Sequence, residues 1–493
     1  MTSTPPAVGD RAGLVAGGLL QSRIASARPG DIIWLEPGRT YIGHFVLPPR
    51  DDDDPRPITI RTSGPDAVPP GTRVDPARAS ALATLRSPDR MAALRTSPRT
   101  QRWRIELVTF RANRDGANEI IALGDGSRAQ RTLEDVPSDL ALDRLLIQGD
   151  PIVGQKRAIA LNSARTSITN SHIEGIAAVG VDSQAIAGWN GPGDYIIANN
   201  YLEAAGENVL FGGADPAVPN LSPTGIVIRG NTLTKPAAWR SPAVRWQVKN
   251  LLELKNARGV VIEDNLFERS WAQAQSGYSI LFTVRNQDGR CPWCQVEDVR
   301  FVGNVVRDVA AGIAIHGRDY THPSRQTNRI LIRNNLFEGM DRKWGGDGYL
   351  LQLTGNPRDV VVDHNTVVHG ESGGLAKVDG VVEGFVFTNN LVWHGSYGII
   401  ASDRSPGGDS IRINLPGAVI EGNVIAGGNP AVYPPRNLFP TLEQFNEVIA
   451  AWVGGHDKLR NSTLWRDHST DGLPPGVGFG RAVHAPLPLP STM

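Results

Sequence analysis

Basic side chains recur at matching places in a series of short apolar segments. In NLLELKNA, SILFTVRN and GIAIHGRD, the apolar alternation predicts strands that carry Lys255, Arg285 and Arg318 on the outer face. An uncharged lysine is a base, and neighbouring cations favour its uncharged form. The planar guanidinium of arginine binds a carboxylate through two hydrogen bonds. These residue types together can remove a carbon-bound proton next to a carboxylate group.

Other polar side chains are expected on the same face. Glu253 precedes Lys255 by two residues and His316 precedes Arg318 by two, so the members of each pair should point to the same side. We interpret His316 and Arg318 as substrate-binding residues. Arginine scarcely loses its proton, so Tyr278 or protonated Lys255 is the candidate acid that protonates a leaving oxygen.

Three carboxylates, Glu207, Asp215 and Glu253, lie in neighbouring segments and allow several interpretations. They can contribute to substrate or cation binding, or orient Lys255 through an ion pair. They can also form the acid and base of a glycoside hydrolase. The Asp-Asp and Arg-x-Lys signatures of polygalacturonases are not visible, which weakens the hydrolase interpretation.

Two tryptophans, Trp189 and Trp239, occur in the same part of the chain. Sugar rings pack their apolar faces on aromatic planes, so both are candidate substrate-binding residues, although a tryptophan can equally fill a turn. The histidines show no metal-ligand spacing such as HExxH, and the sequence identifies no metal ligands.

A repeat must position these side chains. Short alternating segments that end in asparagine recur at intervals of 25 to 39 residues, with the final Asn at 200, 231, 265, 304, 335, 365, 390 and 423. Asparagine tolerates a sharp corner, and stacked amides can bond to the copies above and below. A second strand series, which includes the three basic segments, lies between them. Two strand series and a variable connection in each coil predict an all-β, right-handed parallel β-helix, which is a solenoid.

The periodicity also divides the chain. We expect an N-terminal segment and capping helix over 1–39, and the β-helix over 40–428 with an excursion from the coil at about 72–101. Residues 429–493 should form a C-terminal cap and a Pro-rich tail. An amphipathic helix predicted over 440–453 could cover the open end of the solenoid, which repeat proteins need.

Composition excludes several classes of partner. Lys+Arg and Asp+Glu both number 50, so no overall charge favours nucleic acid, and no segment approaches the ~20 apolar residues of a membrane span. The N-terminus lacks the basic region of a signal peptide. We therefore expect a secreted or periplasmic monomer if a signal has been removed, and otherwise a cytoplasmic one. Cys291 and Cys294 are compatible with a local disulfide, a redox pair or loop chemistry.

The overall pattern resembles the pectate-lyase-like β-helix superfamily, over about 400 residues. The stretch ELKNARGVVIEDNLF followed by GYSILFTVRN resembles alginate lyases and chondroitinase B. This resemblance implies that Lys255 is the base and that Arg285 protonates the leaving oxygen or binds the substrate carboxylate. Those enzymes carry acidic calcium ligands five and seven residues before the lysine, where this chain has Asn250 and Val248. We therefore expect no required cofactor, with calcium as the alternative.

The leading hypothesis is a polysaccharide lyase that cleaves a uronic-acid-containing polysaccharide by β-elimination. The alternatives are a glycoside hydrolase that uses Glu207, Asp215 or Glu253, and a non-catalytic carbohydrate-binding protein, because a fold alone does not specify an activity.

Overall fold

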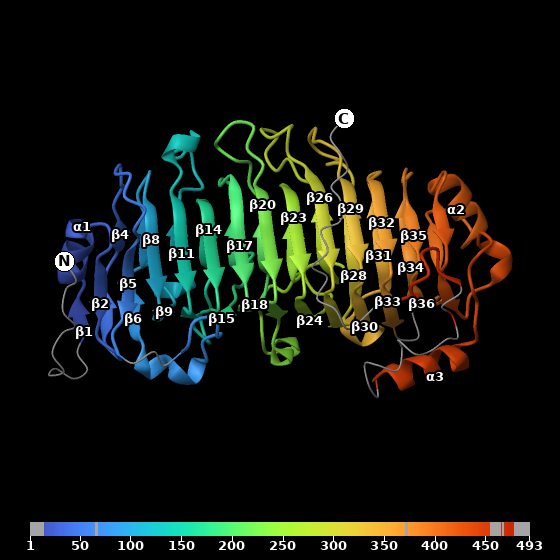
Figure 1. Ribbon diagram of the computed structural model, residues 1–493, viewed down its shortest axis with the longest axis horizontal. Coiled ribbons are helices and arrows are strands. Elements are labelled where there is room, and N and C mark those ends of the chain that lie inside the picture. The colour runs from blue at the N-terminus through green and yellow to red at the C-terminus, as the bar shows by residue number, and fades with distance from the viewer. Residues whose placement is uncertain (1–13, 65–67, 370–372, 454–464, 466–467, 478–493) are drawn as a thin grey trace.

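The computed structural model describes residues 14–64, 68–369, 373–453, 465 and 468–477. In this part of the chain the strands form three parallel sheets that run along one elongated solenoid (Figure 1). The right-handed parallel β-helix predicted from the sequence is confirmed.

Each coil contributes one strand to each sheet, so neighbours in a sheet come from successive coils. Sheet A contains β1 (Leu14–Ala16), β3 (Thr40–Ile42), β6 (Ala83–Arg86), β9 (Val108–Arg111), β12 (Leu146–Gln148), β15 (His172–Ile176), β18 (Tyr201–Ala204), β21 (Thr232–Thr234), β24 (Leu266–Ser270), β27 (Val305–Val309), β30 (Leu336–Met340), β33 (Thr366–His369), β36 (Leu391–Trp393) and β39 (Val424–Ala426).

Sheet B holds the strands that the recurring asparagines follow. It contains β2 (Ile32–Leu35), β5 (Ile58–Thr62), β8 (Gln101–Glu106), β11 (Ser138–Asp143), β14 (Ala164–Thr169), β17 (Gly193–Ala198), β20 (Thr224–Arg229), β23 (Ala257–Glu263), β26 (Val296–Val302), β29 (Asn328–Arg333), β32 (Arg358–Asp363), β35 (Val386–Thr388) and β38 (Val419–Glu421).

Sheet C is the second predicted strand series. It contains β4 (Phe45–Leu47), β7 (Leu94–Thr96), β10 (Glu119–Leu123), β13 (Arg157–Leu161), β16 (Gln184–Gly188), β19 (Glu207–Phe211), β22 (Leu252–Leu254), β25 (Tyr278–Thr283), β28 (Ala311–His316), β31 (Tyr349–Thr354), β34 (Gly374–Asp379) and β37 (Ile399–Ala401).

The third strand of each coil, which lies in sheet A, is absent from our prediction of two strand series. Its strands begin one residue after the corner asparagine, as in Asn200 followed by β18. The sequence therefore runs from one strand into the next with only a two-residue corner, as between β17 and β18, and the two strands look like one segment. The coil has three faces as a result.

The asparagines stack at the corner between sheets B and A. The backbone N–H of Asn265 donates to Oδ1 of Asn304 (3.0 Å), and that of Asn304 donates to Oδ1 of Asn335 (2.8 Å). Equivalent bonds continue the ladder from Ser171, whose N–H donates to Asn200, as far as Asn437. Because these residues are buried, the ladder satisfies polar groups that would otherwise be costly inside the fold.

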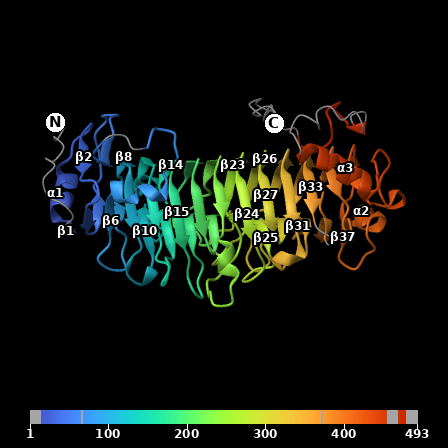
Figure 2. The ribbon, with the colours of Figure 1, turned by 90° about the horizontal axis from the view of Figure 1, so that it is seen from below.

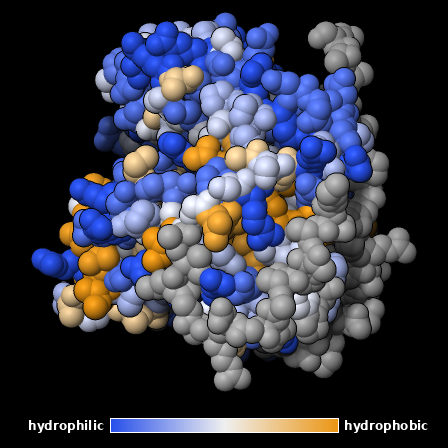
Figure 3. All heavy atoms as spheres, turned by 90° about the vertical axis from the view of Figure 1, so that its left-hand side faces the viewer, coloured by the Kyte–Doolittle hydropathy of each residue, from blue (hydrophilic) through white to orange (hydrophobic). Residues whose placement is uncertain are grey.

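The interior of the solenoid is apolar along its length. Stacked phenylalanines such as Phe267, Phe301 and Phe337 lie 5.5 to 6.4 Å apart between ring centres. At the N-terminal end α1 (Gly18–Ser26) inserts Leu20 and Ile24 into this core, as expected for a cap. Seen from that end, the surface is mainly hydrophilic with scattered apolar residues (Figure 3).

The C-terminal end differs from our prediction. The helix expected over 440–453 exists as α3 (Leu442–Val453), but Phe445 packs on Leu391 and Val424, which point outward from sheet A. α3 therefore lies on the flank of the solenoid (Figures 1 and 2). The end is covered instead by α2 (Gly408–Asn414), which contributes Ile411 to the core, and by Tyr433. Residues 408–414 fall within the range 40–428 that we assigned to the coils.

The predicted domain limits also need correction. β2 pairs with β5 over Ile32–Leu35, so the coils begin before residue 40. Within the predicted excursion, β6 and β7 pair with their neighbours in the sheets, and only the segment between β5 and β6 leaves the coil. That segment contains the short 3-10 helix η1 (Pro76–Ala81). Most of the Pro-rich tail lies outside the described residues.

The remaining short 3-10 helices lie in the connections between strands. They are η2 (Arg114–Gly116), η3 (Leu133–Asp135), η4 (Ala237–Arg240), η5 (Arg342–Trp344) and η6 (Pro430–Val432). Among the described residues, no helix is long and apolar enough to cross a membrane.

Candidate active site

Lys255 and Arg285 lie on adjacent coils at the end of sheet C. Lys255 directly follows β22 and Arg285 follows β25, and the backbone N–H of Arg285 donates to the carbonyl of Lys255 (3.0 Å). Both side chains are on the outer face, with 16% and 37% of their surface exposed. The inward positions before them, Leu254 and Phe282, are paired in register and buried in the core.

Glu253 is the partner of Lys255. The Nζ atom of Lys255 lies 3.6 Å from Oε1 of Glu253, which also accepts a hydrogen bond from the Thr283 hydroxyl (3.1 Å). The other oxygen accepts from the amide of Asn250 (3.1 Å). Glu253 is only 2% exposed, so it orients Lys255 and has little surface that a ligand could contact.

A cavity of about 430 Å³ opens on sheet C beside this pair. Its walls include Tyr278, Thr283, Arg285, His316 and Tyr320. Lys255 is not one of the lining residues; it lies in the preceding coil and is linked to the wall residue Thr283 through Glu253. Arg318 is exposed and donates to Oε1 of Gln326 (3.1 Å), so the structure does not bring it to the cavity wall as we expected.

His316 presents a free ring nitrogen. Its Nδ1 is 2.8 Å from the Thr354 hydroxyl, while its buried Nε2 has no hydrogen-bond partner among the described residues. Burial, and secondly the charge of Arg285, hold the pKa of His316 below its usual value. The imidazole is therefore neutral at neutral pH and can donate or accept a proton at Nε2.

Two carboxylates fix the other polar groups of the cavity. Asp319 lies 3.6 Å from Nη1 of Arg285 and accepts the backbone N–H of Asn286 (2.9 Å). Asp347 accepts the hydroxyl of Tyr278 (3.4 Å). Burial, together with the charge of Asp347, raises the pKa of Tyr278, which therefore keeps the proton that an acid must donate.

Asp215 has a different role from the one considered above. Its two oxygens accept the backbone N–H groups of Gln287 (2.7 Å), Asp288 (3.0 Å) and Arg290 (2.9 Å). Asp215 is thus an anchor for the loop that follows Arg285. The disulfide between Cys291 and Cys294 closes the same loop, as the first of the three interpretations of these cysteines predicts.

Glu207 is completely buried. Its carboxylate accepts from Nε2 of Gln184 (2.9 Å) and lies 3.4 Å from Nζ of Lys249, which also contacts Asp182. Burial, and then the nearby Glu253 and Asp182 carboxylates, raise the pKa of Glu207. A side chain without exposed surface cannot protonate a sugar oxygen in this conformation, which argues against it as a hydrolase acid.

The two candidate tryptophans lie apart from the cavity. Trp189 faces a different cleft on sheet C, beside Arg157. Trp239 in η4 packs in an apolar cluster with Trp246, Trp271 and Trp344. The second interpretation of tryptophan, as a residue that fills a turn, describes Trp239.

Several residues of the site were absent from the sequence-based candidates. Thr283 lies two residues before Arg285, and Asp319 directly follows Arg318. Their closeness in sequence to a basic candidate residue could have identified them as members of the site. No such signal marked three residues that lie in connections between strands. Asn250 contacts Glu253, and Lys249 contacts both Glu207 and Asp182.

The residues present do not fit the calcium site implied by the resemblance. Val248 is buried in the tryptophan cluster, and the amide nitrogen of Asn250 is bonded to Glu253 and Gln275. The ammonium group of Lys249 lies beside Glu207, where a metal ion would be repelled. The described residues contain no group of three His, Cys, Asp or Glu side chains that could hold a metal ion.

Solved structures share the fold. The alginate lyase AlyGC of polysaccharide lyase family 6 superimposes with a TM-score of 0.50 at 16% identity, over 85% of this chain and 52% of that chain. This chain thus spans about half the length of AlyGC.

Other matches are more distant. A mannuronic-acid-specific family 6 lyase from human gut microbiota gives a TM-score of 0.44 at 12% identity, over 83% of this chain and 90% of that chain. The GH87 α-1,3-glucanase of Streptomyces thermodiastaticus gives 0.47 at 12% identity, over 86% and 69%. No family model and no curated protein matches the sequence. The comparisons confirm the resemblance to parallel β-helix enzymes, including lyases, at the level of the fold.

Proposed function

We propose that this protein is a polysaccharide lyase that cleaves an acidic, uronate-containing polysaccharide by β-elimination. The observation that carries the proposal is the juxtaposition of Lys255 and Arg285 on adjacent coils, at a cavity whose walls include Arg285, His316 and Tyr278. A base, a guanidinium for a carboxylate and two further proton carriers lie on one outer face. The family 6 lyases with this fold support the reaction type.

The reaction needs the carbon-bound proton beside the uronate carboxylate to become acidic. Arg285 pairs with that carboxylate and stabilises the negative charge that develops when the proton leaves. Lys255, in its uncharged form, accepts the proton. The electron pair forms a double bond to the neighbouring carbon, whose bond to the linking oxygen breaks.

The departing oxygen must gain a proton. Tyr278 lines the cavity and retains its hydroxyl proton, and the Lys255 ammonium formed in the first step is the second possible donor. His316 is a substrate-binding residue only if its Nε2, which is buried in this conformation, becomes accessible when the sugar binds. No step requires a metal ion. We further propose that the protein works as a monomer, and as a secreted or periplasmic one if a signal has been removed.

The test is the ultraviolet absorbance of the unsaturated uronate product, with alginate, pectate, glucuronan and glycosaminoglycans as substrates. Lys255→Ala should lower kcat by roughly 10² to 10⁴ without unfolding the protein. Arg285→Lys should lower kcat/KM by about 10², because a point charge cannot replace the planar fork. Arg258→Lys is the matched control, since Arg258 lies in the same coil as Lys255 but pairs with Glu297 on sheet B.

Two outcomes would contradict the proposal. One is the absence of an absorbing product from every acidic polymer. The other is a Lys255→Ala protein that keeps wild-type turnover.

A further inference from the structure

A second cleft lies on sheet C, on coils that precede the Lys255 site. Its volume is about 570 Å³. The outward residues Arg95, Ala122, Ala160 and Ala187 occupy the same register on β7, β10, β13 and β16. Alanine side chains on successive coils leave a shallow floor between the side chains that stand on either side.

One end of this cleft is closed by an aromatic and cationic pair. The guanidinium of Arg157 lies 4.8 Å from the centre of the Trp189 ring. Arg157 is also held by Gln184 (3.0 Å) and Glu119 (3.6 Å), and the Trp189 Nε1 donates to the carbonyl of Gly126 (2.9 Å). These contacts fix the indole before any ligand binds, which lowers the entropic cost of binding.

The cleft contains both basic and acidic side chains. Arg95 is exposed and has no ion pair among the described residues. Glu119 is already paired with Arg157, and Asp135 accepts the Thr132 hydroxyl (2.9 Å). Asp125, at the rim, is exposed, and its side chain accepts the backbone N–H of Ser127 and no other donor in the described part of the chain. The cleft therefore offers one uncompensated guanidinium and one acceptor carboxylate above an apolar floor.

We propose that this cleft is a second saccharide-binding site that holds a distal part of an acidic polysaccharide. A uronate residue has the matching chemistry: a carboxylate for Arg95, hydroxyl groups for Asp125, and an apolar ring face for the alanines and Trp189. The acidic class of the polymer rests on the proposed function. The cleft itself does not depend on the Lys255 chemistry.

The position of the cleft predicts a preference for long chains. β7 and β22 are separated by β10, β13, β16 and β19 in sheet C, so Arg95 lies five strand spacings, or ~24 Å, from the coil of Lys255. A short oligosaccharide cannot occupy both sites. A polymer that reaches both gains affinity from the second contact, since its binding there is intramolecular.

The test measures Kd by calorimetry in the Lys255→Ala background, which prevents consumption of the ligand. The probes are short and long oligouronates prepared from alginate and from pectate, with neutral cello-oligosaccharides for comparison. Arg95→Glu should weaken the binding of long oligouronates about tenfold or more. Ala122→Phe, which fills the floor without entering the core, should have the same effect.

Arg86→Glu is the matched control. Arg86 is exposed on β6 in the same coil as Arg95 but on sheet A, and its variant should bind as the parent protein does. Unchanged affinity in both Arg95→Glu and Ala122→Phe, or the absence of oligouronate binding to the parent protein, would overturn the inference. Binding that depends on Arg95 without any unsaturated product would instead refute the lyase reaction and leave the cleft assigned.

Discussion

Replacement of Asp215 distinguishes an anchoring carboxylate from a catalytic one. Asp215→Ala removes the acceptor of three backbone N–H groups, at 2.7, 3.0 and 2.9 Å, from residues 72 to 75 positions away in the chain. A hydrogen bond to a charged group contributes about 1.5–3 kcal/mol, and the three are not additive, so we expect the loop to lose about 3–5 kcal/mol of local stability. The strands make none of these bonds, so the solenoid should stay folded.

Hydrogen exchange of the amides of Gln287, Asp288 and Arg290 measures this loss. About 3 kcal/mol corresponds to faster exchange by roughly 10². Because the loop begins at Arg285, kcat/KM should fall while the ultraviolet spectrum of the product stays the same. Asp215→Asn keeps one acceptor oxygen and should lie between the wild type and Asp215→Ala in both measurements.

The opposite result would support a hydrolase. An Asp215→Asn protein with no turnover, but with unchanged amide exchange in the loop, would show that the carboxylate acts in the chemistry. A reducing-end product without the unsaturated chromophore would agree with it. Our interpretation of Asp215 as a positioning residue would then be wrong.

Three further predictions concern the ladder, the cavity histidine and metal dependence. Asn304→Ala should lower the free energy of unfolding, measured in urea, by about 2–4 kcal/mol, because it removes buried hydrogen-bond partners of Asn265, Ile262 and Asn335. Asn437→Ala, at the end of the ladder, should lower the free energy of unfolding by less. The pKa of His316 in the folded protein lies below its ordinary value of 6.5, so the unfolded chain binds more protons. The free energy of unfolding should therefore fall as the pH drops through 6.5. A His316→Gln protein with an equally steep pH dependence would contradict this. EDTA should leave activity intact, and a loss that calcium restores would contradict the expectation.

The period-two alternation was sufficient to predict that Lys255 and Arg285 face outward on sheet C, but it fails for Tyr278, which has the parity of the core residues Ile280 and Phe282 and lines the outer cavity. Lys255 and Arg285 are outward on adjacent coils because the buried Leu254 and Phe282 beside them are paired in register. The asparagine corner was equally predictable, since a recurrent residue at the end of a recurrent strand must stack when coils stack. Both inferences require only the local sequence and the repeat.

Alternation cannot show what covers an outward side chain. Asp215 and Glu207 were both candidate site carboxylates, but Asp215 binds a loop that begins 72 residues later, and Glu207 is buried beside Lys249 and Gln184. Trp239 stands in a connection whose contacts are with other connections. Such contacts depend on how loops of unequal length fold over the solenoid, which no repeat encodes.

Lys235 is the strongest example. It is fully buried, and its ammonium group lies 2.7 to 3.0 Å from five acceptors, among them the carbonyls of Ala204 and Asn250. No motif marks it in the sequence, and a lysine after a strand would ordinarily be placed on the surface. Two of these acceptors, Gly206 and Asn208, flank Glu207 in the chain. Lys235 therefore supports this part of sheet C from inside the solenoid.

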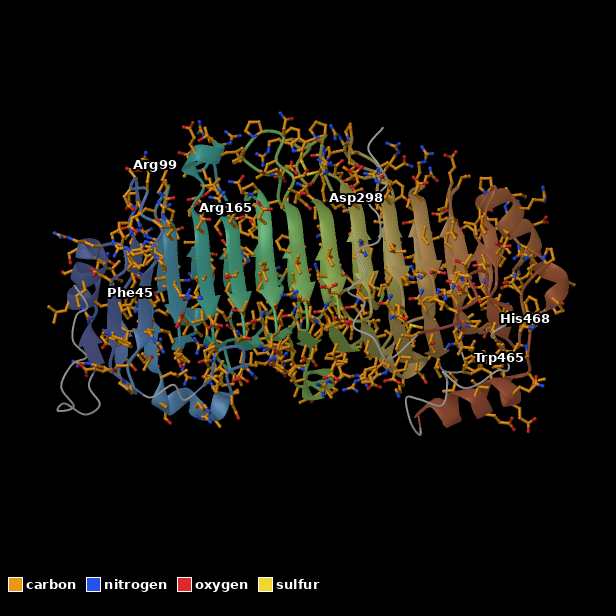
Figure 4. All side chains as sticks on the ribbon, in the orientation of Figure 1. Phe45, Arg99, Arg165, Asp298, Trp465 and His468 are labelled. Carbon is orange, nitrogen blue, oxygen red and sulfur yellow. A yellow bond between two sulfur atoms is a disulfide. The ribbon has the colours of Figure 1, made fainter. Side chains whose placement is uncertain are left out.

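Sheets B and C differ in how many of their charged side chains are held, although sheet B also contains one buried cluster, in which Arg144 pairs with Glu106 and Asp143. On sheet B, ion pairs such as Arg165 with Asp139 and Arg329 with Asp298 are exposed, and Figure 4 shows Arg165 and Asp298 at that sheet. Exposed pairs of this kind contribute little to stability and cost little.

On sheet C several polar side chains are buried although they point away from the core. Gln184, Glu207 and Glu253 are almost inaccessible and are linked to Arg157, Lys249 and Lys255 by contacts that continue from coil to coil. Burial of a carboxylate is expensive unless it is paired, and on sheet C the pairing partners include the basic residues beside the two clefts. The arrangement is intelligible if these groups hold Lys255 and Arg157 in fixed positions for a ligand. Sheet C is therefore where a polysaccharide should bind, at the Lys255 cavity and at the Arg95 cleft.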